Sequence, residues 1–239
     1  MKISDRLLMI SENIERDEIV ADIGTDHGFL PLYLCLTEKC NKVILSDISE
    51  NSLDKAKKNC KLIYPNKEFD FRLGSGIEVL ENNEVDTVVI AGMGGILMTE
   101  ILENNLVKSH SFKKFILQPR SQIGRLRYWL YNNGFEIINE ELVREGNRIC
   151  EILTVISSKE MRPKSVFDID SVEMEIPNSL IHFYNNLTAE YITKKLSDEL
   201  QIKKNLEFSK TNNENNKKTN IIRIKYIKEL LGQLENKNE

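Results

Sequence analysis

The 239-residue sequence contains no uninterrupted apolar run near the ~20 residues that a membrane-spanning helix requires. Its four cysteines include no C-x-x-C pair, so their spacing gives poor support to a zinc site or a disulfide framework and favours buried thiols in a reducing compartment. The amino-terminal stretch is charged throughout and lacks the apolar core that a secretory signal needs. These absences predict a cytoplasmic protein that binds neither a membrane nor a metal ion.

The sequence also lacks G-x-G-x-x-G, the fingerprint with which dinucleotide-binding sheets hold a pyrophosphate. Instead, an apolar run that contains Asp22 leads into the turn G-T-D-H-G of residues 24–28, after which helical spacing resumes. Strand, glycine turn and helix form the first βα unit of a Rossmann-like sheet. Because a carboxylate at Asp26 repels a pyrophosphate but suits a sulfonium or an ammonium group, the turn favours S-adenosylmethionine (SAM) over NAD.

Further apolar runs predict the rest of an α/β sheet. Parallel strands are expected at 42–48, 69–73, 85–91 and 112–117, followed by an antiparallel hairpin at 135–143 and 148–156. Helices are expected at 3–14, 31–37, 50–62, from 96 onward and at 122–132. Five parallel βα units closed by a hairpin are typical of the seven-stranded Rossmann-like sheet of class I methyltransferases, which we expect to span residues 1–158.

Candidate ligand-binding residues follow the carboxyl ends of the predicted strands, the edge where open α/β sheets bind their ligands. Asp47 ends the second strand at the position where nucleotide-binding sheets place a carboxylate on the ribose hydroxyls, although it could instead cap the next helix. The glycine-rich turn at 74–76 is expected beside an adenine ring. The run Gly92-Met93-Gly94-Gly95 is expected to form a turn that brings the backbone close to a ligand.

The carboxyl-terminal third has a different pattern. Residues 159–177 are irregular and acidic, and we expect a linker there. From 178 onward the pattern is helical, with a polar break at 211–219, and the apolar stripes consist of Ile181, Tyr184, Leu187, Tyr191, Leu196, Leu200 and Leu206, then Ile221, Ile224, Ile227, Leu231 and Leu234. Two such stripes favour an antiparallel, coiled-coil-like pair of helices over 178–239.

Charge is distributed unevenly along the chain. The net charge is −4, yet residues 178–228 carry 10 lysines and arginines against 5 acidic residues. An acidic body with a basic tail can bind a polyanion such as RNA through the tail. Lysine-rich helix faces are more often simply solvated, so this signal is weak by itself.

Seven segments, in this order, resemble the bacterial tRNA (adenine(22)-N(1))-methyltransferase family: DIGTDHGFLP, SDI, RLGSGIE, VVIAGMGG, FILQP, LRYWLYNNGFEI and EGNRICEIL. The resemblance covers residues 3–157, and it is the combination of the DIGTDH and AGMGG runs that makes it specific. It implies a SAM-dependent enzyme that methylates N1 of adenine at tRNA position 22. It also implies a C-terminal two-helix coiled coil, which we expect to hold tRNA together with a basic surface.

The strand-end pattern and the resemblance together give a hypothesis for the site. The cofactor-binding residues are expected to be Asp22, Gly24, Thr25, Asp26, Gly28, Asp47, Ile48, Gly74, Ser75, Gly76, Ala91, Gly92 and Met93. The residues expected at the methyl-transfer site are His27, Gly92, Met93, Gly94, Gln118 and Arg120. Two positions depart from the family, which usually has asparagine in place of Arg120 and often has aspartate in place of Ser75.

The implied chemistry needs little acid–base machinery. N1 of adenine carries an in-plane lone pair, so the enzyme mainly positions and desolvates the reactants, after flipping the stacked base out. His27 has both a structural and a catalytic interpretation, and we expect Trp129 in the core. Arg6 has two possible positions, toward the ligand pocket or in solvent, of which solvent is favoured. Two alternatives stay open: methylation of another RNA, a protein or a small molecule, and a non-catalytic SAM-fold scaffold that acts through its coiled coil.

Overall fold

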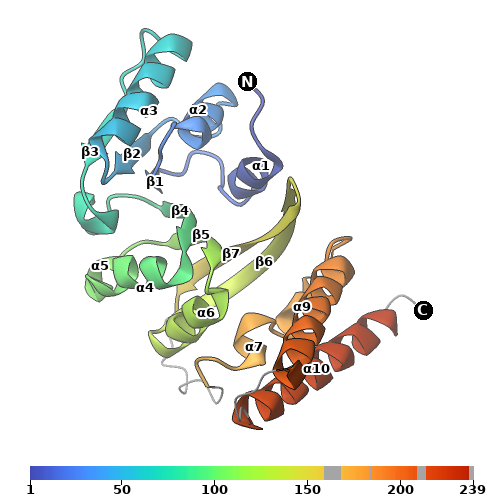
Figure 1. The fold of residues 1–239 in the computed structure, drawn as a ribbon. Helices are drawn as coiled ribbons and strands as arrows, with labels where there is room; N and C mark the ends of the chain where they lie inside the picture. Colours follow the sequence, from blue (N-terminus) through green and yellow to red (C-terminus); the bar gives the residue numbers. More distant parts are fainter. Residues whose placement is uncertain (159–167, 184, 209–213, 237–239) are drawn as a thin grey trace.

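The computed structural model describes residues 1–158, 168–183, 185–208 and 214–236. Its centre is a seven-stranded sheet with the order β3-β2-β1-β4-β5-β7-β6 (Figure 1). The strands are β1 (Val20–Ile23), β2 (Val43–Asp47), β3 (Asp70–Leu73), β4 (Thr87–Gly94), β5 (Lys114–Ser121), β6 (Phe135–Glu145) and β7 (Arg148–Ser157). Strands β1 to β5 pair in parallel, and β7 joins β5 and β6 antiparallel. The predicted sheet is therefore confirmed.

Helices cover both faces of this sheet. They are α1 (Asp5–Glu12), α2 (Phe29–Leu36), α3 (Glu50–Ile63), α4 (Gly95–Glu103), α5 (Leu106–Ser109) and α6 (Ile123–Asn132), with a 3-10 turn at Gly76–Val79. Successive strand residues point to opposite faces, so Val88 and Ile90 pack with α4 and α6 whereas Val89 packs with α1 and α2. Burial on both faces explains why these strands read as continuous apolar runs.

The glycine run after the fourth strand differs from its prediction. Residues 92–94 belong to β4, which stays paired with β5 through register shifts as far as Gly94 opposite Ser121, and α4 begins at Gly95. The expected separate turn at 92–95 is therefore wrong. Two longer strands, rather than a loop, carry Met93 and Arg120 to the carboxyl edge, because the irregular pairing extends the ladder beyond the apolar core.

The C-terminal helices are α7 (Val172–Glu175), α8 (Ser179–His182), α9 (Thr188–Phe208) and α10 (Glu214–Glu235). The helical pattern expected to run on from 178 is interrupted, since Asn185 accepts a hydrogen bond from the Leu187 amide and its own amide donates to the Thr188 hydroxyl before α9 begins. Helix α10 begins inside the predicted polar break, because its first turns are exposed and tolerate polar residues. Tyr184 lies outside the described residues.

The seam between α9 and α10 is also more polar than predicted. Leu200 and Ile221, expected on the apolar stripes, are 39% and 57% exposed. Glu199 and Asn220 are buried in their place, and the Asn220 amide donates to the Glu199 carboxylate over 2.8 Å. A satisfied polar pair can occupy such a seam without the cost of an unpaired buried group. The supercoil of a coiled coil stays a prediction.

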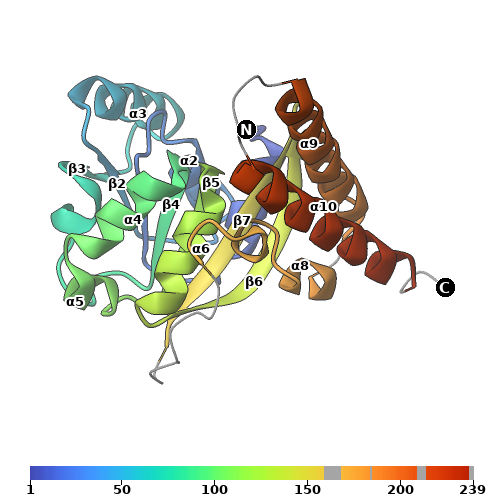
Figure 2. The ribbon, with the colours of Figure 1, turned by 60° about the horizontal axis from the view of Figure 1, so that its bottom comes forward.

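The C-terminal helices share a core with the β6–β7 hairpin. Leu142 of β6 packs with Ile176, Leu180, Tyr191 and Ile227. In both ribbon views α9 and α10 lie beside this edge of the sheet (Figures 1 and 2). Within the described ranges, no helix has both the length and the apolar character needed to cross a membrane.

Candidate functional site

The end of β1 carries a buried carboxylate. Asp22 is 7% exposed, and the Thr25 hydroxyl donates to its Oδ2 over 2.7 Å. Burial raises the pKa of Asp22 to about 6, against the lowering effects of the Thr25 hydrogen bond and of Arg6. A cation placed beside this carboxyl group stabilises its charged form. The position therefore suits a positively charged ligand.

The turn after β1 brings the backbone itself to the edge. Gly24 and Gly28 have φ values of +75° and +70°, a backbone conformation that residues other than glycine rarely adopt. A Cβ atom at Gly24 would lie 2.2 Å from Cε of Met93, and one at Gly28 would lie 3.2 Å from Cβ of Ala56. The space above the turn is thus kept for Met93 or for a ligand that displaces its flexible side chain.

Asp47 is fixed between this turn and the start of α3. Its Oδ2 accepts from the Asp26 amide over 3.2 Å and its Oδ1 from the Ser49 amide over 2.9 Å. Ser49, not Asp47, caps α3 by accepting from the Ser52 amide. Because each carboxylate oxygen has two lone pairs, Asp47 retains acceptor capacity for a diol. This geometry fits the ribose hypothesis better than the capping alternative.

An apolar and glycine-rich surface borders Asp47. Ile48 is 74% exposed, and the Gly74 amide donates to the carbonyl of Asp47 over 3.1 Å. A hollow of about 490 Å³ opens between the 74–76 turn and α4, and its lining includes Ser75, Gly76, Leu97 and Ile101. The adenine position near Ser75 stays a prediction, which this surface fits.

Gln118 is held at the end of β5. Its Oε1 accepts from the Gly92 amide over 3.2 Å and from Nη1 of Arg6 over 3.1 Å, and its Nε2 donates to the Pro119 carbonyl. Arg6 also pairs with Glu145 over 2.9 Å and is only 16% exposed. The expected solvent position of Arg6 is therefore wrong. A local helical pattern does not connect residue 6 with partners in β5 and β6, so this contact could not be predicted from sequence spacing.

His27 lies in the turn between β1 and α2, at the carboxyl edge of the sheet. Its ring stacks on Phe29 with 5.2 Å between centroids, and its Nε2 lies 3.4 Å from Oδ2 of Asp26. The Asp26 carboxylate also pairs with Lys55 over 3.3 Å. Lys55 thus already pairs with the Asp26 carboxylate, whereas the backbone amide of Asp26 supports Asp47. Both interpretations of His27 stay open.

A cleft of about 720 Å³ connects this edge with the C-terminal helices. Gln118, Arg120 and Arg148 lie on its sheet side, and Tyr191 and Lys194 on its α9 side. Two of its cations, Lys195 and Arg223, pair with Glu175, and Arg125 pairs with Asp170. Within the part of the chain that the structure describes, Arg120, Arg148 and Lys194 are exposed and pair with no carboxylate. The lining also includes the exposed carboxylate of Asp198, which has no ion pair among the described residues, so three unpaired cations face one unpaired carboxylate and the balance of the cleft is positive.

The residues present fit SAM. Two carboxylates, Asp22 and Asp47, stand at neighbouring strand ends, and positive-φ glycines leave the backbone open between them. Trp129, by contrast, is 9% exposed and stacks on Phe135, as its predicted core position requires. Among the residues that the structure describes, no group of three or more histidine, cysteine or acidic side chains could hold a metal ion.

Comparisons with known proteins agree with this geometry. A family model described as a methyltransferase domain matches residues 3–153. The tRNA (adenine(22)-N(1))-methyltransferase of Bacillus subtilis is 35% identical over 153 residues, and the match spans 64% of each chain. The chain thus covers less than two thirds of the length of this curated relative.

Solved structures extend the likeness to the C-terminal helices. The crystal structure of the B. subtilis m1A22 tRNA methyltransferase TrmK matches with a TM-score of 0.82 and 28% identity, over 96% of this chain and 99% of that one. A proposed tRNA (m1A22) methyltransferase of Streptococcus pneumoniae, in complex with SAM, matches with a TM-score of 0.81 and 25% identity, over 96% and 100%. The likeness therefore includes the sheet, its edge and the appended helices.

Proposed function

The chain belongs to the methyltransferase-domain family, the class I fold that includes the bacterial m1A22 enzymes, and we propose that it methylates N1 of adenine 22 of tRNA with SAM. One observation carries the proposal: a cleft with an excess of unpaired cations includes Gln118 and Arg120, two residues of the predicted methyl-transfer site. A small-molecule methyltransferase has no need of such a surface, whereas a polyanionic substrate does. The names of the matched relatives support the same substrate.

SAM supplies an electrophilic methyl group when it is bound, and this chain's residues bind and orient it. We assign the ribose hydroxyls to Asp47, because its carboxylate is fixed by two backbone amides and keeps free lone pairs. We assign the methionine end to the surroundings of Asp22, because burial raises the pKa of this carboxyl group and a cationic ligand stabilises its charged form. Ile48 and the 74–76 turn flank the adenine.

The target base enters beside Gly92, Met93 and Gly94. Gln118 is the polar side chain whose orientation is fixed there, since three hydrogen bonds hold its amide. N1 attacks without prior loss of a proton, so the site needs only to align the base and exclude water. Arg120, at the position where the family usually has asparagine, is exposed in the cleft and is assigned to the substrate backbone rather than to the base.

We assign the remaining hold on tRNA to the C-terminal helices. Lys194 faces the same cleft as Arg120 and Arg148, so a strand of tRNA can contact both walls at once. The enzyme is proposed to act in the cytoplasm, where tRNA and SAM occur together and where its four cysteines remain free thiols.

The test is methylation of an unmodified tRNA transcript with methyl-labelled SAM, followed by mapping of the modified nucleotide. We expect label at N1 of A22 and none in a transcript with guanine at that position. An Asp47→Asn variant should lose most of the activity, whereas Asp54→Asn, a matched change on the surface of α3, should keep it. Label in another nucleotide, or transfer only to protein, would overturn the proposal.

A further inference from the structure

A buried ion network joins the methyltransferase sheet to the C-terminal helices. Arg127 of α6 is 0% exposed, and its guanidinium contacts four groups from three other segments, β6, β7 and α7. Nε donates to Glu140 over 2.8 Å, Nη2 donates to Glu151 over 2.6 Å, and Nη1 donates to the carbonyls of Met174 and Glu175, both over 3.0 Å. A guanidinium has five N–H donors in a fixed plane, so these partners fix its direction.

Each of the two carboxylates binds partners in both the methyltransferase sheet region and the C-terminal helices. Glu140 uses one oxygen for Arg127 and the other for the Ser179 hydroxyl of α8, over 2.7 Å. Glu151 uses one oxygen for Arg127 and the other for the Tyr191 hydroxyl of α9. Each carboxylate of the sheet hairpin therefore also binds one hydroxyl group of the C-terminal helices.

Charge and packing agree with this arrangement. Burial alone would lower the pKa of Arg127, but the two glutamates raise it, so the guanidinium stays charged. Burial and Glu151 raise the pKa of Tyr191 well above its usual range, so its hydroxyl stays a donor. A Cβ atom at Gly124 would lie only 3.1 Å from the amide nitrogen of Glu175, so α7 approaches α6 closely enough for its carbonyls to reach Arg127.

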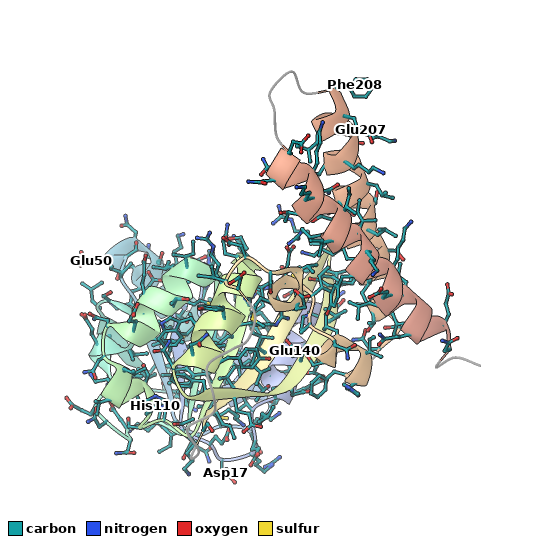
Figure 3. All side chains as sticks on the ribbon, turned by 90° about the horizontal axis from the view of Figure 1, so that it is seen from below. Asp17, Glu50, His110, Glu140, Glu207 and Phe208 are labelled. Carbon is teal, nitrogen blue, oxygen red and sulfur yellow. The ribbon has the colours of Figure 1, made fainter. Side chains whose placement is uncertain are left out.

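A second set of contacts continues the network to the remaining helix. Glu175 of α7 pairs with Lys195 of α9 over 2.6 Å and with Arg223 of α10. Arg223 also pairs with Glu199, which holds Asn220. All four C-terminal helices are thus connected to one guanidinium. Figure 3 places Glu140 where the sheet meets these helices, far from the tip marked by Glu207 and Phe208.

The network also lies under the substrate cleft. Glu151 and Tyr191 line the cleft, and α6 begins directly after the cleft residues Arg120, Ser121 and Gln122. A buried ion pair is weak evidence for stability, because desolvation opposes the attraction, but its geometry is well defined. An arrangement of this kind serves to fix one orientation of two packed parts.

We propose that Arg127, with Glu140 and Glu151, is a positioning group that sets the cleft wall carrying Lys194 against the methyl-transfer edge. This proposal rests on the proposed function for its tRNA readout. Arg127 touches neither the cofactor nor the base. It acts through the placement of α9, so its loss affects tRNA use and leaves SAM binding intact.

The test weakens the network without leaving a buried charge unpaired. Tyr191→Phe and Ser179→Ala, singly and together, remove the two hydroxyl links but keep both ion pairs of Arg127. Arg127→Lys keeps the charge and loses the fixed fork. Tyr226→Phe is the matched control, because its hydroxyl donates only within the C-terminal part, to the Ile176 carbonyl.

We expect the double variant to raise the KM for tRNA about tenfold, the scale of a lost hydrogen bond to a charged group, with SAM affinity within about twofold of wild type. Hydrogen exchange should become faster over 172–183 and the first turns of α9, but not in β1 or β4. Arg127→Lys should show the same pattern more strongly, and Tyr226→Phe should show neither change.

A lower melting temperature with an unchanged KM for tRNA and unchanged exchange would overturn the proposal, as would a KM effect without faster exchange. An equal loss of SAM affinity would also overturn it. If the wild-type chain fails to methylate the transcript, the proposed function falls. The network is then judged by exchange and by tRNA binding alone, where the same differences are expected.

Discussion

At the proposed cofactor edge, the groups assigned to the ligand come from turns beside strand ends, whereas the junction with the C-terminal helices is held by side chains far apart in sequence. Asp47 is held by the amides of Asp26 and Ser49, all within two short turns. Arg127 is held by residues 140, 151, 174 and 175. The edge therefore depends on backbone conformation, and the junction depends on charge pairing. Substitutions at the edge should therefore change SAM binding, whereas substitutions at the junction should change stability and tRNA use.

The largest effect is expected at the junction. Arg127→Met leaves Glu140 and Glu151 buried without their cation, so the free energy of unfolding should fall by about 3–5 kcal/mol. Urea unfolding of the variant and the wild type measures this difference in free energy. Arg125→Met is the matched control on the same helix, because Arg125 is half-exposed and its pair with Asp170 contributes at most about 1 kcal/mol. An equal loss of unfolding free energy in the two variants would contradict the greater importance assigned to the buried ion pairs of Arg127.

The next effect concerns backbone conformation at the edge. Gly24→Ala places a side chain at a φ of +75° and against Met93, so SAM binding should weaken by about 2–4 kcal/mol. Gly146→Ala is the control, because Gly146 also has a positive φ, +59°, but its Cβ would meet no atom within 4 Å. Calorimetric titration of both variants with SAM should separate them, and similar affinities would remove Gly24 from the site.

Asp47 is expected to contribute somewhat less. Asp47→Asn keeps the shape but loses the charge that accepts two hydroxyl groups, so SAM affinity should fall by about 1–3 kcal/mol. The substitution also weakens the hydrogen bonds from the amides of Asp26 and Ser49. The free energy of unfolding of the same variant, measured in urea, shows whether it is still folded when SAM affinity is measured. Unchanged affinity in a folded variant would show that the ribose is bound elsewhere.

The smallest of these effects is a pH dependence. Burial raises the pKa of Asp22 to about 6, while a solvated aspartate titrates near pH 4. The stability that this group contributes is therefore fully present below pH 4 and is lost as pH rises through 6. A cationic ligand favours the charged form, so SAM affinity should rise up to about tenfold between pH 5 and 7. Asp22→Asn should flatten that rise, and parallel profiles would exclude Asp22 as its cause.

The difference between the two regions also explains what the sequence could predict. Continuous apolar runs and glycine turns are local signals, so the strands, the closing hairpin and the placement of Asp22 and Asp47 at strand ends followed from them. Arg127 lies among apolar residues of α6, and no spacing rule connects it with its partners in β6, β7 and α7. The exposure of Leu200 likewise depends on how α9 rotates against α10, which propensity alone does not determine.

The salt dependence of tRNA binding tests whether tRNA occupies the cleft between the two regions. Each phosphate contact that is lost lowers the slope of log affinity against log salt by about 1. The double variant Arg148→Gln/Lys194→Gln, which removes one unpaired cation from each wall, should therefore lower the slope by about 2. Lys58→Gln/Lys61→Gln, on the exposed surface of α3, should keep the wild-type slope. Equal slopes for all three proteins would contradict tRNA binding in the cleft.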